Sequence, residues 1–130
     1  MPSTQKLFFF LALLFFARAN AQHHLTLRVQ NHSLLHANDS IFVAGNFNGW
    51  NPGKTALSRE QDGTGWSIDL SLPQATYEFK FTLGSWETVQ VSKAGNDVGN
   101  NSINLKCDTS LLFSIDAWKN EFDVLPKKHT

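Results

Sequence analysis

Cysteine is almost absent from this 130-residue sequence, in which Cys107 is the only one. A single thiol cannot form an internal disulfide, so the fold must be held together by packing. Cys107 ends the alternating segment SINLKC, and that position predicts a buried, structural thiol. The lone cysteine also lacks an evident base partner, which argues against a cysteine nucleophile.

An excess of either charge is missing as well, because 11 Lys and Arg residues stand against 11 Asp and Glu residues. Such a balance gives the chain no excess positive charge with which to bind nucleic acid or an anionic membrane. We therefore expect neutral or small partners, with no nucleic acid and no membrane among them.

Long hydrophobic runs are limited to one, Leu7–Ala17, which follows Lys6 and precedes Ala19-Asn20-Ala21. A charged start, a short apolar middle and a small-x-small site are typical of a secretory signal peptide. The run is short for a membrane span, and Arg18 disfavours the alternative of an uncleaved anchor. We predict a signal peptide over residues 1–21, cleaved near Ala21, and a secreted protein, extracellular or periplasmic. Cleavage would leave 109 residues with 9 basic and 11 acidic side chains.

Catalytic motifs are missing too: the sequence has no Gly-x-Ser-x-Gly elbow, no His-Glu-x-x-His and no phosphate-binding glycine loop. The carboxylates near the aromatic loops are Glu78, Glu87 and Asp97. Glycosidase work needs two of them in a cleft that desolvates one, and short loops on a small domain offer little to build it. We expect no enzyme activity and no cofactor.

A metal site is conceivable at His23 and His24, which would lie next to the new N-terminus. Exposed histidines on a fraying end are more often inert, however, so no metal is expected.

What the sequence does contain is the period-2 alternation of β-strands. Residues 23–30, 65–72 and 76–82 each alternate apolar and polar side chains, and the last two, separated by a short turn, predict a hairpin. Further short strands are expected in the segments IFVAG, WETVQV, SINLKC and LLFSIDAW. No sustained helical spacing follows Ala21.

These strands predict an all-β fold, an immunoglobulin-like antiparallel β-sandwich of about seven strands, with an open barrel as the alternative. The module is expected over residues 22–120, followed by a C-terminal tail over residues 121–130, where the pattern decays.

The four tryptophans divide into two pairs. Trp66 opens an alternating strand on its apolar face and is predicted to be core, and Trp118 closes the last strand, where it can cap the sandwich. Trp50 and Trp86 instead lie in NGWNP and GSWET, beside glycine and polar residues. An indole in such a loop needs a burial site or a partner.

Two loop indoles with a lysine between them suit a neutral sugar, because an indole covers the C–H face of a pyranose while amides and ammonium groups bond its hydroxyls. Lys80 is predicted to point away from the core, toward Trp86. The alternative is a surface lysine paired with Glu78 or Glu87.

Four motifs in order, IFVAGNFNGWNP, YEFKF, GSWET and VGNNSI, resemble the starch- and glycogen-binding modules. These are carbohydrate-binding module families 20 and 48, which include the glycogen-binding domain of the AMP-activated kinase β subunit. The similarity covers about residues 24–106. It implies an immunoglobulin-like sandwich and a non-catalytic protein that binds α-glucan such as starch, glycogen or maltooligosaccharides.

The resemblance also implies a site, and it falls on the positions Trp50, Lys80, Trp86, Glu87 and Asn100. Asn101 could replace Asn100 after a shift of one residue. A leucine that inserts between glucosyl units in the kinase branch would fall near Asn96, where this chain has none, and no second, tyrosine-based site can be placed.

Three hypotheses follow: a secreted α-glucan-binding module, a protein-interaction or docking module associated with a separate secreted hydrolase or esterase, and a module for a different polysaccharide. Loss of glucan binding on substitution of Trp50 or Trp86 would distinguish the first.

Overall fold

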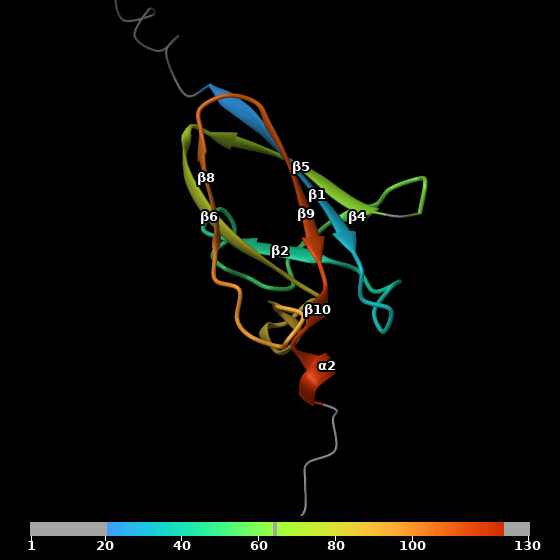
Figure 1. The fold of residues 1–130 in the computed structure, drawn as a ribbon. Helices are drawn as coiled ribbons and strands as arrows, with labels where there is room; N and C mark the ends of the chain where they lie inside the picture. Colours follow the sequence, from blue (N-terminus) through green and yellow to red (C-terminus); the bar gives the residue numbers. More distant parts are fainter. Residues whose placement is uncertain (1–20, 64, 124–130) are drawn as a thin grey trace, which may run out of the picture.

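The computed structural model describes residues 21–63 and 65–123 of the chain. Within these ranges, ten strands account for almost all of the regular structure, with one 3-10 turn and one short helix, α2 (Asn120–Asp123), so the prediction of an all-β fold is confirmed. Two sheets face each other across a common core (Figure 1). The predicted signal peptide, apart from Ala21, and residues 124–130 of the expected tail lie outside the described residues.

In the first sheet β1 (Gln22–Asn31) lies between β5 and β9, and its alternate residues Leu25, Leu27 and Val29 are fully buried on the core face. Its partner β5 runs antiparallel to it and places Trp66 beside Val29. The strand order is β4 (Ser58–Arg59), β5 (Gly65–Pro73), β1 (Gln22–Asn31) and β9 (Thr109–Ile115).

The second sheet is antiparallel and has β2 and β6 at its centre. Tyr77, Phe79 and Phe81 of β6 face the core, and the residues between them face outward. The strand order is β3 (Thr55–Ala56), β2 (Phe42–Gly45), β6 (Ala75–Thr82) and β8 (Asn101–Leu105). A separate pair, β7 (Gln90–Val91) and β10 (Ala117–Trp118), closes one end of the sandwich beside α2 (Figure 1).

The core is rich in aromatic rings that pack edge to face. Phe113 of β9 contacts Phe79 and Phe81 of β6 at centroid distances of 5.7 and 5.2 Å, and so joins the two sheets. Phe79 and Phe81 are fully buried, and full burial of one such side chain contributes about 1.5–3 kcal/mol. Trp66 is buried as predicted, and Trp118 is fully buried, with its indole N–H donated to the side-chain oxygen of Asn31 at 3.2 Å.

The predicted hairpin of residues 65–72 and 76–82 is wrong, because β5 and β6 belong to different sheets. The short turn at Gln74 carries the chain across the sandwich instead. Two half-buried strands alternate in the same way whether they pair side by side or face each other, so periodicity cannot separate the two arrangements.

The sandwich is also not purely antiparallel, since β9 runs parallel to β1 over residues 109–115. Alternation carries no information on strand direction. Of the ten strands in the described ranges, four have only two residues, which explains the smaller number expected from sequence.

Cys107 is exposed, so the prediction of a buried thiol is wrong. The alternation of SINLKC ends with the strand at Leu105, and Cys107 falls in the following bend. The segment WETVQV likewise begins not as a strand but as a 3-10 turn, η1 (Trp86–Thr88).

Beyond the expected end of the module at residue 120, Glu121 still contacts the sandwich. Its carboxylate accepts hydrogen bonds from the Trp118 amide at 2.7 Å and from the Ser33 hydroxyl at 2.9 Å. Among the residues that the structure describes, no helix is long and apolar enough to cross a membrane.

Candidate functional site

The residues predicted to bind a ligand come from four segments around one end of the second sheet. Trp50 lies in the loop after β2, Lys80 on β6, Trp86 and Glu87 in η1, and Asn100 just before β8. In β6, Ala75 pairs with Leu105 at one end and Phe79 with Asn101 near the other. Lys80 and Asn100 are therefore near the end of β6 that leads to Trp86, whereas the Trp50 loop leaves β2 at Gly45, opposite Phe79, and returns to this end through Pro52.

The loop that carries Trp50 is held by the side chain of Asn48. Its oxygen accepts the Gly45 amide at 3.0 Å, and its nitrogen donates to the Val43 carbonyl and the Thr55 hydroxyl, both at 2.9 Å. An amide can do both because it carries acceptor and donor atoms on one group. Asn48 thus ties the loop to both strands that flank it.

Gly49 and Trp50 both adopt left-handed backbone conformations, with φ of 68° and 58°. This conformation is easy for glycine and unfavourable for a bulky residue, where it costs about 1–3 kcal/mol. The Trp50 amide nevertheless donates to the Gly45 carbonyl at 2.9 Å, which closes the turn. The loop therefore fixes the direction of a half-buried indole at the expense of local strain.

The Trp50 loop is in contact with the segment that leads to Trp86. The fully buried Thr82 hydroxyl donates to the Pro52 carbonyl at 2.6 Å and accepts the Gly84 amide at 3.0 Å. A Cβ atom at Gly53 would lie 2.7 Å from the Gly84 carbonyl oxygen, so the two backbones touch. The bases of the two indole-bearing loops are therefore fixed relative to each other.

Trp86 begins the turn η1 and exposes 40% of its surface. Ser85 and Thr88 bracket the turn: the Thr88 amide and hydroxyl both donate to the Ser85 carbonyl, at 3.1 and 3.0 Å. Glu87, the next residue, is exposed as well. A large apolar ring held on a short hydrogen-bonded turn is available for stacking.

Lys80 faces away from the core, as predicted, but its partner is neither Glu78 nor Glu87. Its ammonium lies 2.7 Å from a carboxylate oxygen of Asp97, in the loop before β8. The hydrogen bond from Lys80, then the Gly99 amide and the positive charge of Lys80, lower the pKa of Asp97 below its usual value of 3.8. The Lys80 side chain is only 16% exposed, which holds it in a defined position.

Asn100 and its neighbour Asn101 differ in what their amides do. The Asn101 side chain donates to the Phe79 carbonyl at 3.2 Å, whereas the exposed Asn100 amide makes a long contact of 3.4 Å to the Glu78 carboxylate. The register that pairs Asn101 with Phe79, continued by one residue, places Asn100 opposite Lys80. Of the two asparagines, Asn100 is the one more accessible to a ligand.

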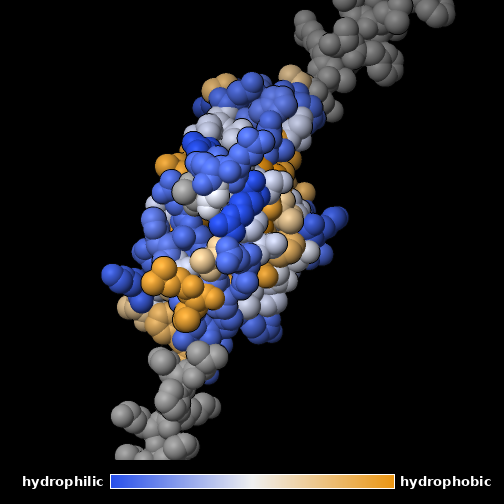
Figure 2. All heavy atoms as spheres, turned by 90° about the vertical axis from the view of Figure 1, so that its right-hand side faces the viewer, coloured by the Kyte–Doolittle hydropathy of each residue, from blue (hydrophilic) through white to orange (hydrophobic). Residues whose placement is uncertain are grey.

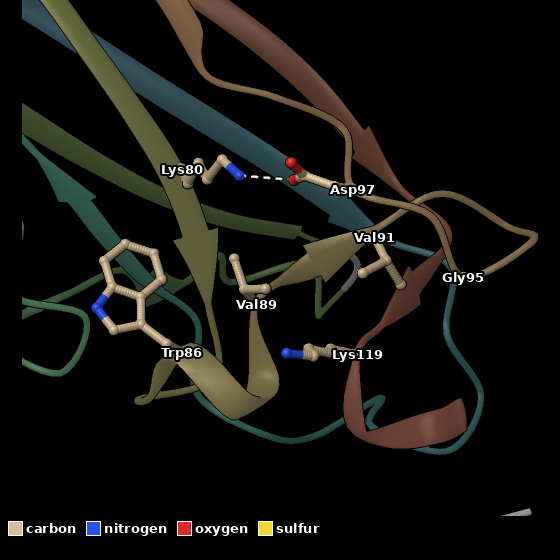
Figure 3. Close-up of a pocket in the computed structure, with 7 residues that line it drawn as sticks. All are labelled: Lys80, Trp86, Val89, Val91, Gly95, Asp97 and Lys119. Atoms are coloured by element: carbon tan, nitrogen blue, oxygen red, sulfur yellow. Dashed lines mark hydrogen bonds and ion pairs between the residues drawn. The ribbon is translucent and has the colours of Figure 1, made fainter. Parts of the chain in front are cut away.

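Lys80 and Trp86 line a single pocket of about 330 Å³ (Figure 3). Trp50, Glu87 and Asn100 are not part of its lining, and the ring contacts found in the described ranges include none between Trp50 and Trp86. The remaining lining residues are Val89, Val91, Gly95, Asp97 and Lys119.

Sequence reasoning missed this part of the pocket. The sequence pattern indicates Asp97 only as a possible catalytic carboxylate and does not single out Val89, Val91 or Lys119. The pairing of β7 with β10 brings Lys119 to the site from 33 residues beyond Trp86, and nothing local in the sequence signals that pairing. The sequence signal for Lys119 is limited to its position next to Trp118, a position that alternation places on the outer side of the last strand.

The alternative chemistries find little support at this site. A general acid needs a raised pKa, whereas the pKa of Asp97 is lowered. In β1, Nδ1 of His24 lies 3.1 Å from a carboxylate oxygen of Asp69, and Nδ1 of His23 lies 4.0 Å from one of Asp108. Within residues 21–63 and 65–123, no three His, Cys, Asp or Glu side chains are grouped so that they could hold a metal ion.

Comparison with known proteins relates the chain to segments of amylolytic enzymes. An alpha-amylase of Niallia circulans is 32% identical over 101 residues, which is 75% of this chain and 8% of the enzyme. An amylopullulanase of Thermoanaerobacter thermohydrosulfuricus is 35% identical over 68 residues, 50% of this chain and 4% of the enzyme. The chain thus resembles small parts of large starch-active enzymes, which fits a non-catalytic domain associated with them.

No protein-family model matches the sequence. Among solved structures, a pilus-presented adhesin overlaps 75% of this chain and 27% of its own, with 20% identity and a TM-score of 0.33. A second structure of that adhesin in the same crystal form gives a TM-score of 0.32 at the same identity. This overlap is too low to indicate a shared fold or function.

Proposed function

We propose that this chain is a secreted, non-catalytic module that binds α-glucan through Trp50, Lys80, Trp86, Glu87 and Asn100. The observation that carries the proposal is the common pocket of Lys80 and the exposed Trp86. An ammonium group beside an exposed indole provides a hydroxyl partner next to a surface for the C–H face of a sugar. The similarity to starch-active enzymes supports α-glucan as the ligand.

Each residue has a separate role in this proposal. Trp50 and Trp86 stack on successive glucosyl units. Lys80 has three donors and uses one of them for Asp97, so two remain for sugar hydroxyls. Asn100, opposite Lys80 in the continued register, bonds a further hydroxyl, and Glu87 accepts one beside Trp86.

The expected affinity is modest, because an open site gains little beyond the cost of ordering a flexible oligosaccharide. Dissociation constants of roughly 1 µM to 1 mM correspond to about −8 to −4 kcal/mol. The module therefore suits attachment to a polymer with many equivalent sites, where repeated contacts raise the effective concentration.

The test is retention of the chain in gels that contain soluble starch or glycogen, compared with gels that contain a cellulose derivative. We expect Trp50→Ala, Trp86→Ala and Lys80→Met each to reduce retention strongly, with Leu112→Ala, an exposed residue of the first sheet, as the control. Retention of the variants equal to that of the parent would overturn the proposed site. Retention in the cellulose gel alone would instead indicate a module for a different polysaccharide.

Secretion is proposed from the sequence of residues 1–21, and N-terminal sequencing of the mature chain tests it. A new terminus near residue 22 is expected. Absence of catalysis is tested separately, by incubating the chain with starch and measuring reducing ends, which we expect not to increase above the level without protein.

A docking role is the second candidate, and one observation favours it. The loop between β1 and β2 exposes 93% of Leu34 and 71% of Leu35, and Figure 2 shows hydrophobic side chains clustered near the lower end of the face seen there. Adjacent exposed leucines are typical of contact with another protein. If this role is the correct one, the folded chain binds a starch-active hydrolase, loses that binding in Leu34→Ser/Leu35→Ser, and shows no affinity for glucan.

A further inference from the structure

The pocket next to Trp86 extends beyond the proposed stacking site, toward β7 and β10. Figure 3 shows Val89 and Val91 between two lysines, with Lys80 on one side and Lys119 on the other. The Lys80 side belongs to the site already proposed. Lys119, Val89 and Val91 have no role in that proposed site.

Lys119 is held at the pocket by its backbone. Its amide donates to the Val89 carbonyl at 2.9 Å, directly after the residue pair that joins Trp118 to Gln90. Its ammonium makes no ion pair among the described residues and is directed toward the side where Val89 and Trp86 lie (Figure 3). The position of the stem is therefore fixed, while the donors remain available.

The lining of this pocket selects among ligand chemistries. Asp97 offers acceptors and Lys119 offers donors, and a sugar hydroxyl can bond both because it donates and accepts. A phosphate or carboxylate could use the lysines but would meet the like charge of the Asp97 carboxylate, whereas a neutral sugar can use all three side chains. The valines and the indole provide an apolar floor for C–H groups.

We propose that this pocket is an additional glucan subsite, in which Lys119 bonds hydroxyls of the glucosyl unit that follows the one stacked on Trp86. The inference rests on the proposed function and adds a direction to it: the oligosaccharide continues past Trp86 toward β10. A volume of about 330 Å³ lies at the small end of the range for ligand pockets, so it suits one end of a chain rather than a whole ligand.

Affinity should then depend on ligand length. Maltose reaches only part of the site, whereas longer maltooligosaccharides occupy the additional subsite as well. Calorimetric titration with maltose through maltoheptaose should show tighter binding for the long ligands in the parent chain. In Lys119→Met, which keeps the stem and removes the ammonium, we expect long ligands to bind about three- to tenfold more weakly and short ones unchanged.

The matched control is Lys106→Met, which removes an exposed lysine from the turn after β8, at the opposite end of the sheet. Lys119→Arg should restore most of the length dependence, since it keeps a charged donor at the end of a long stem. Methyl signals of Val89 and Val91 should shift with maltoheptaose but not with maltose.

The outcomes separate the two proposals. Binding of long and short ligands by Lys119→Met with the parent's affinities would overturn the subsite and leave the proposed function standing. Failure of the parent chain to bind any maltooligosaccharide would overturn both. Equal weakening of all ligand lengths by Lys119→Met would place Lys119 in the primary site and so also contradict an additional subsite.

Discussion

The hydroxyl of Thr82 donates to the carbonyl of Pro52 at 2.6 Å and so connects the Trp50 loop with the strand that leads to Trp86. Thr82 is fully buried and also accepts the Gly84 amide. One side chain thus satisfies a backbone group in each of the two loops. We regard this connection as what fixes the separation of the two indoles.

Replacement of Thr82 by valine keeps the shape of the side chain and removes the hydroxyl. The Pro52 carbonyl and the Gly84 amide lose their partner, and we expect the free energy of unfolding to fall by about 1–3 kcal/mol. Affinity for β-cyclodextrin should fall as well, because the two loops are no longer joined. Urea denaturation and calorimetry measure the two effects. Thr76→Val, an exposed change on the same strand, should alter neither.

Asn48 supports the same site from the other side of the Trp50 loop. Asn48→Ala removes all three of its hydrogen bonds and should lower the free energy of unfolding by about 1–3 kcal/mol. Asn48→Asp keeps an acceptor for the Gly45 amide but loses both donors, so it should also destabilise the protein. Asn104→Ala, on the exposed face of β8, is the control. If Asn48→Ala is as stable as this control, the loop does not depend on the hydrogen bonds of the Asn48 side chain.

The pair of Lys80 and Asp97 makes stability depend on pH in a defined direction. Because the pKa of Asp97 is lower in the folded chain than in the unfolded one, the pair stabilises the fold above pH 3.8. This contribution is lost as the pH falls through the lowered pKa. Asp97→Asn should therefore melt at a lower temperature than the parent near pH 7, and the difference should disappear under strongly acidic conditions. A difference that persists unchanged at low pH would contradict an ionic origin.

The matched control for Asp97→Asn is Asp116→Asn, which changes an exposed carboxylate between β9 and β10. Asp116 forms no ion pair among the described residues. Its substitution should have little effect on melting at any pH. The effect of Asp97→Asn near pH 7 is expected to be small, since Asp97 is 74% exposed and water screens the pair.

Alternation of apolar residues was enough to predict the long strands β1, β5 and β6 and core residues such as Leu25, Leu27 and Trp66, because burial on one face of a strand leaves a period of two in the sequence. It could not predict pairing. β5 and β6 face each other across the core, and β9 joins β1 in parallel, yet both arrangements bury the same alternate residues.

The residues of the candidate site likewise include some that could be predicted from the sequence and others that could not. Trp50 and Trp86 were distinguishable because an indole among glycines and polar residues has no apolar alternation to bury it. The partner of Lys80 was not predictable, since Asp97 lies 17 residues away in a loop whose path depends on the whole fold. Lys119 reaches the pocket only through the pairing of β7 with β10.

The central claim is that Trp50 and Trp86, and not the other two tryptophans, bind the glucan. The indole N–H signals of the four tryptophans can be followed by NMR during titration with β-cyclodextrin, after assignment with single Trp→Phe variants. We predict that the signals of Trp50 and Trp86 shift and saturate together, while those of the buried Trp66 and Trp118 stay in place. Saturating shifts confined to Trp66 or Trp118, or no shift of any indole signal at millimolar ligand, would contradict the account.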